Sequence, residues 1–538
     1  MDKPTINIER LDLTVILIYL VGIVAIGCWA GLRRRSDSEG RSYFLAGRSL
    51  SWPVIGLALF STNISTIHLV SLAQEGYRNG LAYGNFEWMA AFTLIALALF
   101  FAPLYIRSGV ATLPDFLEKR YNRACRDWLA VLSIVAAIFI HISFSLYAGA
   151  LVLKSLFGFD IHMSIFVTAG LSGLYTIIGG LMAVAVTEAI QTVILIGGAM
   201  LITVIGLSHA GGWSGLTASV EPVQLTVLRQ AGDASGLPWY AVLLGYPVIG
   251  LWYWCADQTI VQRVLGAKDE NHARVGALFA GFIKILPVFI FVLPGLICLA
   301  LINQGKIVDK INEDAGNVLA VLIDQLLPVG LKGVMAAALL AALMSTVAGA
   351  LNSIATLFSY DIYRRLRPNA SDHTLVIVGR IVTFTAMAAA ILWSPHVSRF
   401  ESLFQGLNMM ICYIAPPITA VFVWGVFWTK ASARGAFATL VLGSLLGFTV
   451  FLLDWNKEHT GWNVPFMMMA FYLFVICSVI LVVGSIISPQ RNQDEIESLV
   501  WRTPLHALKG EAWNGLGNYK ILTGILFVTM VVLYFIFR

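Results

Sequence analysis

Long apolar segments recur along almost the whole chain and constrain its fold more than any other feature. Because a helix of about 20 residues crosses the hydrocarbon core of a bilayer, a window of that length identifies candidate membrane spans. It finds fourteen: 11–32, 52–74, 81–106, 128–156, 162–182, 185–207, 240–264, 276–301, 331–363, 375–393, 403–428, 435–453, 464–487 and 521–537. Only 12% of the residues are charged, about half the fraction of a soluble domain. The sequence therefore predicts an all-α polytopic membrane protein with about 14 transmembrane helices.

Basic residues fall mainly in alternate loops, which predicts the orientation of the chain. Loops assigned to the inside hold most of them: Arg33, Arg34, Arg35, Arg107, Lys119, Arg120, Arg263, Lys268, Arg364, Arg365, Lys430, Arg434, Arg491 and Lys509. The pair Lys306 and Lys310 is the exception outside. Since the first apolar run comes before its basic cluster, we expect a retained span rather than a signal peptide. These patterns predict a multi-pass plasma-membrane protein with both termini outside, and the short outer loops favour a bacterial inner membrane.

A polar stretch from Ser61 to His68 interrupts the apolar segment 52–74. Six of its eight residues are polar, and Ser, Thr and Asn side chains compete with the backbone for hydrogen bonds. A membrane helix opens only where the freed carbonyl groups line a cavity or meet a ligand. An opened helix would supply oxygen ligands for a cation and, at Asn63 and His68, groups that bind a polar solute. The alternative is a helix interface joined by small polar residues.

Ionisable residues inside predicted spans are functional candidates, because an unpaired charge in the bilayer is costly. Glu87 lies early in the third span and Lys284 interrupts an otherwise apolar one, so both are expected to face a polar cavity. A structural ion pair between two helices is the alternative. Glu188 is a possible ion-pathway residue, whereas Asp257 and Arg263, near the inner face, predict a salt bridge at a helix end.

Two further patterns fit either function or packing. Ala342, Ser345 and Thr346 lie at positions i, i+3 and i+4 of one helix face. Two hydroxyls and a carbonyl form part of an oxygen site that suits a hard cation such as Na⁺, although such hydroxyls also bond to their own turn. The run Trp252-Tyr253-Trp254 presents aromatic faces that suit a sugar ring, or it belongs to an interfacial aromatic belt.

Several motifs resemble those of one transporter family. They are Phe44-Leu45-Ala46-Gly47, Asn63-Ile64-Ser65, Phe86-Glu87-Trp88, Tyr175-Thr176 with Gly179-Gly180, Trp252-Tyr253-Trp254-Cys255 with Asp257-Gln258, and Asp361-Ile362-Tyr363. Over nearly its full length the chain resembles the sodium/solute symporter family, in its sodium–glucose cotransporter branch. The resemblance implies a leucine-transporter-type fold whose core is a 5+5 inverted repeat. It divides the chain into an N-terminal accessory helix and linker, a first repeat, an extracellular loop, a second repeat and C-terminal accessory helices: 1–49, 50–208, 209–237, 238–428 and 429–538.

The resemblance also implies roles for individual residues. The sugar would be held by Asn63, His68, Glu87, Tyr253, Trp254, Lys284 and Asn408. Gates would be formed by Leu72, Phe86 and Phe404 on the outside and by Tyr253 on the inside. Sodium would be bound by main-chain oxygens of Ser61, Ile64 and Ala342 and by the hydroxyls of Ser345 and Thr346. The implied partners are a sodium ion, a monosaccharide such as glucose or galactose, and the lipid bilayer, with uptake by alternating access.

The sequence departs from the family pattern where cargo and stoichiometry are decided. Gly250 stands where relatives place a polar side chain, and Asn408 replaces a longer Gln. Ala348 and Gly349 lack the hydroxyls that hold a second sodium, and Glu188 replaces an Asp there, which predicts one sodium per sugar. No nucleophile–base pair or Gly-rich phosphate loop occurs, so neither an enzyme nor a nucleic-acid partner is expected. The alternatives are symport of another solute, such as a polyol or sialic acid, or a solute-gated sensor or channel.

Overall fold

The fold is almost entirely helical, as the sequence predicts. The structure is a computed structural model that describes residues 6–33, 43–233, 235–308, 311, 317–399, 403–462, 464–489 and 494–538. In these ranges the only β contacts are the isolated bridges Leu50–Ala267 and Arg229–Pro238. Arg34, Arg35, Lys310 and Arg491, which enter the topology prediction, lie outside the described residues.

Among the described residues, twelve helices are long and apolar enough to cross a membrane. They are Arg10–Ala30, Thr66–Ser108, Arg123–Phe157, Ile161–Ile178, Gly180–His209, Glu270–Asn303, Leu331–Leu366, Asp372–Ser398, Gly406–Phe427, Ala433–Trp455, Phe466–Ile487 and Tyr519–Ile536. The predicted spans at 52–74 and 240–264 are helical but interrupted, so the count of fourteen is approximate. The all-α membrane fold is confirmed.

The interrupted segments consist of four short helices and one π-helical turn: α3 (Trp52–Asn63), α4 (Thr66–Asn79), α12 (Trp239–Leu251), η6 (Trp252–Ala256) and α13 (Gln258–Leu265). The remaining α-helices of the first half are α1 (Arg10–Arg33), α5 (Asn85–Ala96), α6 (Ala102–Ser108), α7 (Leu113–Arg120), α8 (Arg123–Ala136), α9 (Ser143–Phe157), α10 (Ile161–His209) and α11 (Gly212–Thr217).

The α-helices of the second half are α14 (Glu270–Ile283), α15 (Leu293–Asn303), α16 (Val318–Leu326), α17 (Leu331–Leu357), α18 (Arg364–Leu366), α19 (Asp372–Trp393), α20 (Leu403–Phe427), α21 (Ala433–Trp455), α22 (Lys457–Thr460), α23 (Phe466–Ile487) and α24 (Tyr519–Ile536). Short 3₁₀ or π turns complete the chain: η1 (Ala46–Arg48), η2 (Gly80–Gly84), η3 (Leu97–Phe101), η4 (Ala137–Ile142), η5 (Pro222–Leu225), η7 (Val288–Val292), η9 (Phe358–Tyr363), η10 (Ser394–Arg399), η11 (Asp494–Leu499), η12 (Pro504–Lys509) and η13 (Gly515–Gly517).

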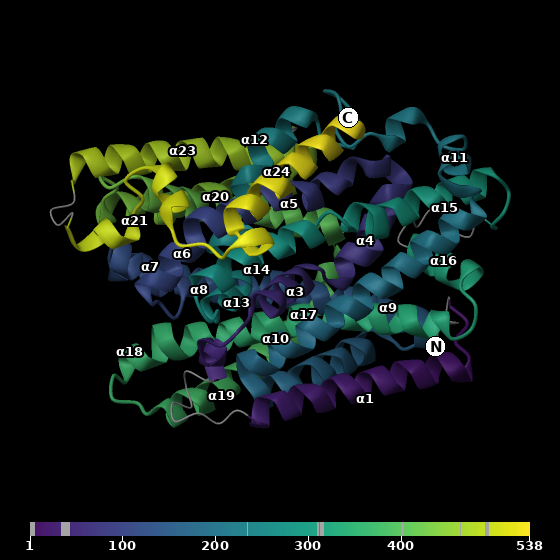
Figure 1. The fold of residues 1–538 in the computed structure, drawn as a ribbon, viewed down its shortest axis with the longest axis horizontal. Helices are drawn as coiled ribbons and strands as arrows, with labels where there is room; N and C mark the ends of the chain where they lie inside the picture. The colour runs from purple at the N-terminus through teal and green to yellow at the C-terminus, as the bar shows by residue number, and fades with distance from the viewer. Residues whose placement is uncertain are drawn as a thin grey trace.

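Helix α17 forms the centre of the molecule, with α3 and α13 beside it (Figure 1). Every residue from Met335 to Leu357 is buried. Many of them are Ala, Gly, Ser or Thr, and small residues let neighbouring membrane helices approach closely. This packing places Ser345 and Thr346 directly against the interrupted segment formed by α3 and α4.

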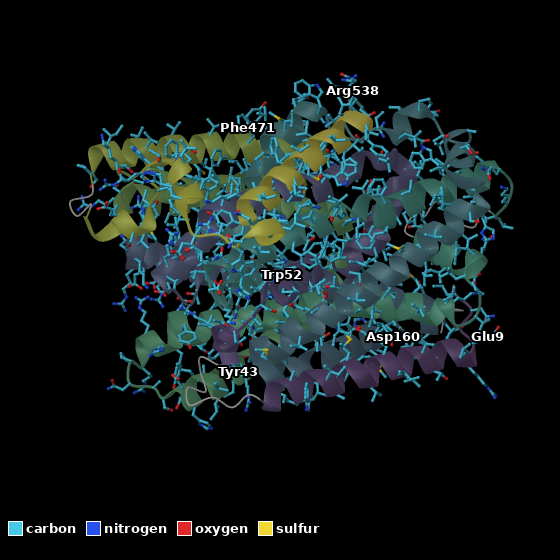
Figure 2. All side chains as sticks on the ribbon, in the orientation of Figure 1. Glu9, Tyr43, Trp52, Asp160, Phe471 and Arg538 are labelled. Atoms are coloured by element: carbon cyan, nitrogen blue, oxygen red, sulfur yellow. The ribbon has the colours of Figure 1, made fainter. Side chains whose placement is uncertain are left out.

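The outer helices present apolar side chains to the surroundings, and in Figure 2 the outward faces of α1 and α23 are mostly carbon. Leu17, Val21, Phe384, Val479 and Val528 are each more than half exposed. Apolar exposure of this extent on several spans is typical of a surface covered by lipid.

One glycine creates the sharpest kink. Gly180 divides α10 with φ 58° and ψ −156°, a conformation that glycine adopts without steric cost. A Cβ atom at this position would lie 2.5 Å from the carbonyl oxygen of Tyr43. The kink therefore separates the two spans predicted at 162–182 and 185–207.

Candidate ion and solute site

The predicted helix break between α3 and α4 is present. Ile64 has φ −80° and ψ 100°, and Ser65 has φ −93° and ψ 171°, so both are extended. The Nδ1 atom of His68 accepts a hydrogen bond from the Ser65 backbone N–H at 3.2 Å and lies 3.0 Å from its Oγ. The neutral ring therefore carries its proton on Nε2. Because the helix stops at Asn63, the last carbonyl groups of α3 lack helical partners.

Hydroxyl groups of α17 contact these carbonyl groups. Ser345 Oγ lies 2.9 Å from both Ser61 O and Ala342 O. Thr346 Oγ1 lies 3.2 Å from both Thr62 O and Ala342 O. Each hydroxyl thus bonds to its own helical turn and also contacts a carbonyl group at the break. The structure is therefore consistent with both interpretations of this pattern, back-bonding within the helix and an oxygen site for a cation. The structure gathers Ser61, Ala342, Ser345 and Thr346 into one set of oxygens.

Ile64, the fifth predicted sodium residue, lies in the break itself and is fully buried. Main-chain and hydroxyl oxygens without a carboxylate suit a monovalent hard cation better than a divalent one, which normally recruits acidic ligands. The described residues contain no group of three or more His, Cys, Asp or Glu side chains placed to hold a metal.

An ion pair lies on the other side of the break. Lys284 Nζ donates to the Glu87 carboxylate and to Asn63 Oδ1. The two charged side chains are no more than 2% exposed, and Lys284 Nζ lies 5.5 Å from the centre of the Trp254 ring. Glu87 lines a cavity, as expected, but Lys284 does not, and the two form the ion pair that was the alternative.

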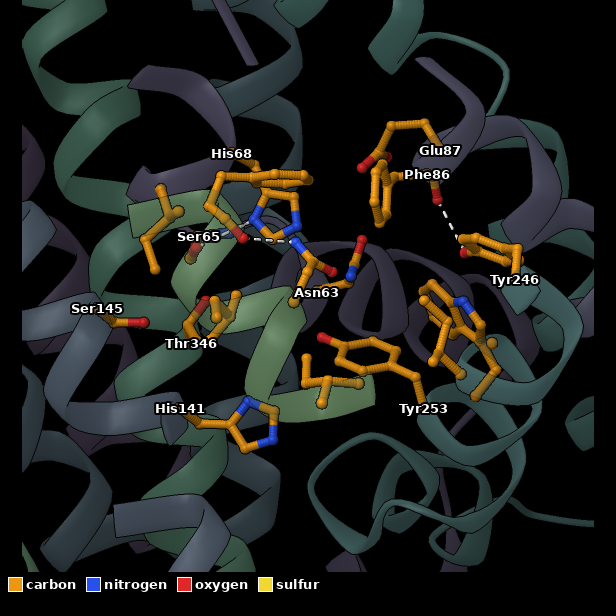
Figure 3. Close-up of a pocket in the computed structure, with 18 residues that line it drawn as sticks. Asn63, Ser65, His68, Phe86, Glu87, His141, Ser145, Tyr246, Tyr253 and Thr346 are labelled. Atoms are coloured by element: carbon orange, nitrogen blue, oxygen red, sulfur yellow. Dashed lines mark hydrogen bonds between the residues drawn. The ribbon is translucent and has the colours of Figure 1, made fainter. Parts of the chain in front are cut away.

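This cavity lies between α4, α5, α9, α12, α17 and α20 (Figure 3). It is lined by Asn63, Ser65, Ile67, His68, Phe86, Glu87, His141, Ser145, Tyr246, Ile249, Gly250, Tyr253, Trp254, Thr346, Phe404, Leu407, Asn408 and Ile411. Six predicted solute residues are among them: Asn63, His68, Glu87, Tyr253, Trp254 and Asn408. Lys284 is outside the lining and contacts Glu87 and Asn63, which belong to it.

A cluster of aromatic side chains packs at the wall of the cavity. The rings of Phe86 and Phe404 meet edge to face with centroids 5.0 Å apart, and Tyr83 lies 5.9 Å from each. His68 packs against Phe404 at 6.0 Å. Leu72, the third predicted outer-gate residue, is buried in α4 but does not line the cavity. Tyr253, the predicted inner gate, lies on the cavity wall beside Trp254 at 5.3 Å.

The comparison with known families agrees with this geometry. Residues 43–443 match the model of the sodium:solute symporter family. The chain belongs to this family. It is 36% identical over 477 residues to sodium/glucose cotransporter 4 of Danio rerio, covering 83% of this chain and 72% of the relative. It is 34% identical to a sodium/mannose cotransporter of Bos taurus, covering 93% and 90%.

A solved structure shares the fold of this symporter. It is a substrate-bound, outward-open Na⁺-coupled sialic acid symporter, which aligns with a TM-score of 0.78 over 90% of this chain and all of the other. The sequence identity is 20%, so the likeness concerns the fold alone. It supports the leucine-transporter-type architecture that the motifs imply.

Sequence reasoning missed three polar groups of the symporter's cavity: His141, Ser145 and Tyr246. His141 lies inside an apolar span, so the rule that identified Glu87 and Lys284 also applies to it. Its Nε2 lies 2.9 Å from Asp257 Oδ2. The hydroxyl of Tyr246 donates to Phe86 O at 2.8 Å. For Ser145 and Tyr246, no sequence pattern distinguishes a cavity residue from one that packs between helices.

The predicted salt bridge between Asp257 and Arg263 is wrong. Asp257 precedes α13, and its Oδ1 accepts from the Thr259 N–H at 2.7 Å as a helix cap. Residues six positions apart lie on different faces of a helix, so Arg263 points elsewhere. Its guanidinium donates to Glu188 at 3.1 Å and 2.5 Å.

Glu188 is fully buried beside the oxygen set. Its Oε1 accepts from Thr62 Oγ1 at 2.7 Å, and Arg263 neutralises its charge. Gly349 permits this arrangement, because a Cβ atom there would lie 2.4 Å from Arg263 Nη2. The structure thus pairs this carboxylate with a buried cation, and its role in an ion pathway remains a prediction.

Proposed function

We propose that the symporter couples the inward movement of one sodium ion to the uptake of a monosaccharide by alternating access. The main support for the proposal is that Thr346 belongs to both the oxygen set and the solute cavity. Its hydroxyl belongs to the oxygen set at the break of α3 and α4, and the same residue lines the solute cavity. An ion bound by this set would hold α17 and the break in the arrangement that shapes the cavity.

The lining of the cavity favours a neutral polyhydroxylated solute. Glu87 offers acceptor oxygens whose charge is balanced by Lys284 behind it, while Asn63, His68 and Asn408 add neutral hydrogen-bonding groups. Tyr253 and Trp254 provide the aromatic faces that suit the C–H surface of a pyranose ring. The curated relatives named for glucose and mannose support this cargo.

The two interrupted helices support an inverted-repeat core. One lies near the start of the assigned repeat 50–208, and the other lies near the start of 238–428. Interrupted helices at corresponding positions of two repeats are the common binding-site device of secondary transporters. We assign 1–49 and 429–538 to accessory helices and 209–237 to the loop that joins the repeats.

Sodium supplies enough energy for accumulation. One charge that crosses a potential of roughly 100 mV yields about 2.3 kcal/mol, and a tenfold sodium gradient adds about 1.4 kcal/mol. The sum of about 3.7 kcal/mol sustains a sugar gradient on the order of 500-fold. With both termini outside and the basic loops inside, the orientation in the plasma membrane is that expected from the positive-inside rule.

Uptake into proteoliposomes tests the proposal. The purified symporter is reconstituted, and entry of labelled glucose, galactose, mannose, a polyol and sialic acid is measured with an inward sodium or potassium gradient. We expect sodium-dependent accumulation of a hexose. Accumulation of the polyol or sialic acid instead would show that the transported solute is not a hexose. Sodium currents without sugar accumulation would indicate a sensor or channel and contradict symport.

A further inference from the structure

The segment between α23 and α24 is bound to the protein rather than projecting from it. We call residues 494–518 the strap; it is the yellow segment that leads into α24 in Figure 1. The backbone N–H of Trp501 donates to a main-chain oxygen of α20 at 2.8 Å, and its indole N–H donates to one of η3 at 2.9 Å. The buried guanidinium of Arg274 donates to Ala507 O at 3.3 Å. These contacts fix the strap at two points.

The strap and the end of α6 line an open basic cavity of about 430 Å³. Its ionisable lining residues are Arg107, Glu497, Arg502, His506 and Lys509. This cavity is separate from the sodium and solute site, because the two lining sets share no residue.

Among the described side chains that line this cavity or pair with its lining, positive charge is in excess. Glu270 accepts from Arg107 at 2.7 and 2.9 Å and also from Arg274 at 2.7 and 3.0 Å, so this trio carries one net positive charge. Arg502 pairs with Glu497, but both side chains are more than half exposed, and such pairs are weak. Lys509 has no ion pair within the described part of the chain and adds a second positive charge. The cavity thus suits an anion.

The strap carries exposed leucines and lies next to the ends of two membrane spans. Leu505, Leu508 and Leu516 are 71%, 39% and 80% exposed. Arg107 lies at the end of the span Thr66–Ser108, and α24 begins at Tyr519, directly after the strap. The strap therefore lies next to the ends of two spans, where exposed leucines are placed to insert into the boundary between headgroups and acyl chains.

We propose that the strap binds the phosphate headgroup of an anionic phospholipid. Arg502 and Lys509 contact the phosphate, since guanidinium and ammonium groups at the membrane surface recognise such headgroups. Leu505 and Leu508 lie among the acyl chains. A soluble phosphate compound would satisfy the basic residues but would leave both leucines in water, so the lipid accounts for more of the observed surface.

Thermal unfolding of the full-length protein in detergent tests the proposal. Dioctanoyl phosphatidylglycerol is titrated against wild type and against the double variant R502Q/K509Q. We expect a concentration-dependent rise in Tm for wild type, and a half-saturating concentration about 30-fold higher for the variant, as for the loss of two basic contacts at an anionic surface. Dioctanoyl phosphatidylcholine should give no comparable rise.

Two controls keep the result specific. The variant K268Q/K430Q loses two exposed basic residues that do not line this cavity, and it should respond as wild type does. The variant L505Q/L508Q should respond less to phosphatidylglycerol while its unliganded Tm stays unchanged. An equal response of R502Q/K509Q and wild type, or no response of wild type, overturns the proposal. A rise produced equally by glycerol 3-phosphate would assign the site to a soluble anion and overturn the lipid.

Discussion

The two helix interruptions differ in what satisfies their freed backbone groups. At the first, between α3 and α4, carbonyl oxygens of Ser61 and Thr62 are contacted by hydroxyls of α17. At the second, between η6 and α13, Asp257 caps the following helix through its own carboxylate. The hydroxyl of Tyr105 donates to Cys255 O at 2.6 Å, and His141 binds Asp257.

This difference indicates which of the two interruptions could bind and release an ion. A hydrogen bond from a hydroxyl to a carbonyl can be exchanged for coordination of one cation by both oxygens, so the first break is expected to accept an ion. A carboxylate that caps its own helix loses a strong hydrogen bond if it turns away. The second break is therefore expected to act as a fixed corner of the cavity, with Tyr253 just before it.

The largest expected effect comes from the ion pair that adjoins the first break. Glu87→Ala leaves Lys284 buried without its partner, and removal of one member of a buried pair costs about 3–5 kcal/mol. We expect sugar uptake to be lost and the Tm to fall. Radiolabelled uptake and thermal unfolding in detergent measure the two quantities.

A paired substitution separates binding from folding in this prediction. E87L/K284M replaces the pair with apolar groups of similar size, which often restores stability. We expect the Tm of the double variant to recover while uptake stays absent. Recovery of uptake together with the Tm would show that the pair is structural and does not contact the solute.

The next effect concerns the oxygen set. Ser345→Ala removes the hydroxyl that bridges Ser61 O and Ala342 O, so the sodium concentration for half-maximal uptake should rise roughly tenfold. Ser353→Ala on the same helix is the matched control, because Ser353 is also fully buried but lies outside the set. A shift of equal size in the control would locate the sodium elsewhere.

The smallest effect on sodium should come from the second break. Asp257→Ala removes the cap of α13 and the partner of His141, which should lower stability by about 1–2 kcal/mol. The half-maximal sodium concentration should change less than about twofold, because no Asp257 contact reaches the oxygen set. Asp269→Ala removes the cap of α14 at an exposed position and controls for cap loss alone. A large rise in the half-maximal sodium concentration of D257A would contradict the proposed difference between the two breaks.

Much of the fold and part of the site were predictable from the sequence. Long apolar runs predicted the spans, because the bilayer demands continuous helices of fixed length. The polar stretch 61–68 predicted the first break, because clustered hydroxyl and amide groups compete with the helix. The second break carries a single carboxylate, Asp257, within aromatic surroundings, so its sequence offered no comparable signal.

Partners in space were the least predictable feature. Arg263 was expected to bind Asp257, its near neighbour in sequence, yet it binds Glu188 on α10. His141 is the partner of Asp257, and nothing in its span, 128–156, indicates that pairing. These pairings depend on which helix faces pack together, and hydropathy alone does not determine helix rotation. The roles of individual residues in sodium and sugar binding came from the family resemblance. The structure adds the contacts that these residues make with one another.

The most direct test is the sugar gradient reached at steady state. Proteoliposomes are held at zero membrane potential with defined sodium ratios, and the internal-to-external ratio of the transported hexose is measured. With one sodium per sugar, a tenfold inward sodium ratio should give about a tenfold sugar ratio, and the two should rise in proportion. A sugar ratio that stays at unity for every sodium ratio would contradict the account.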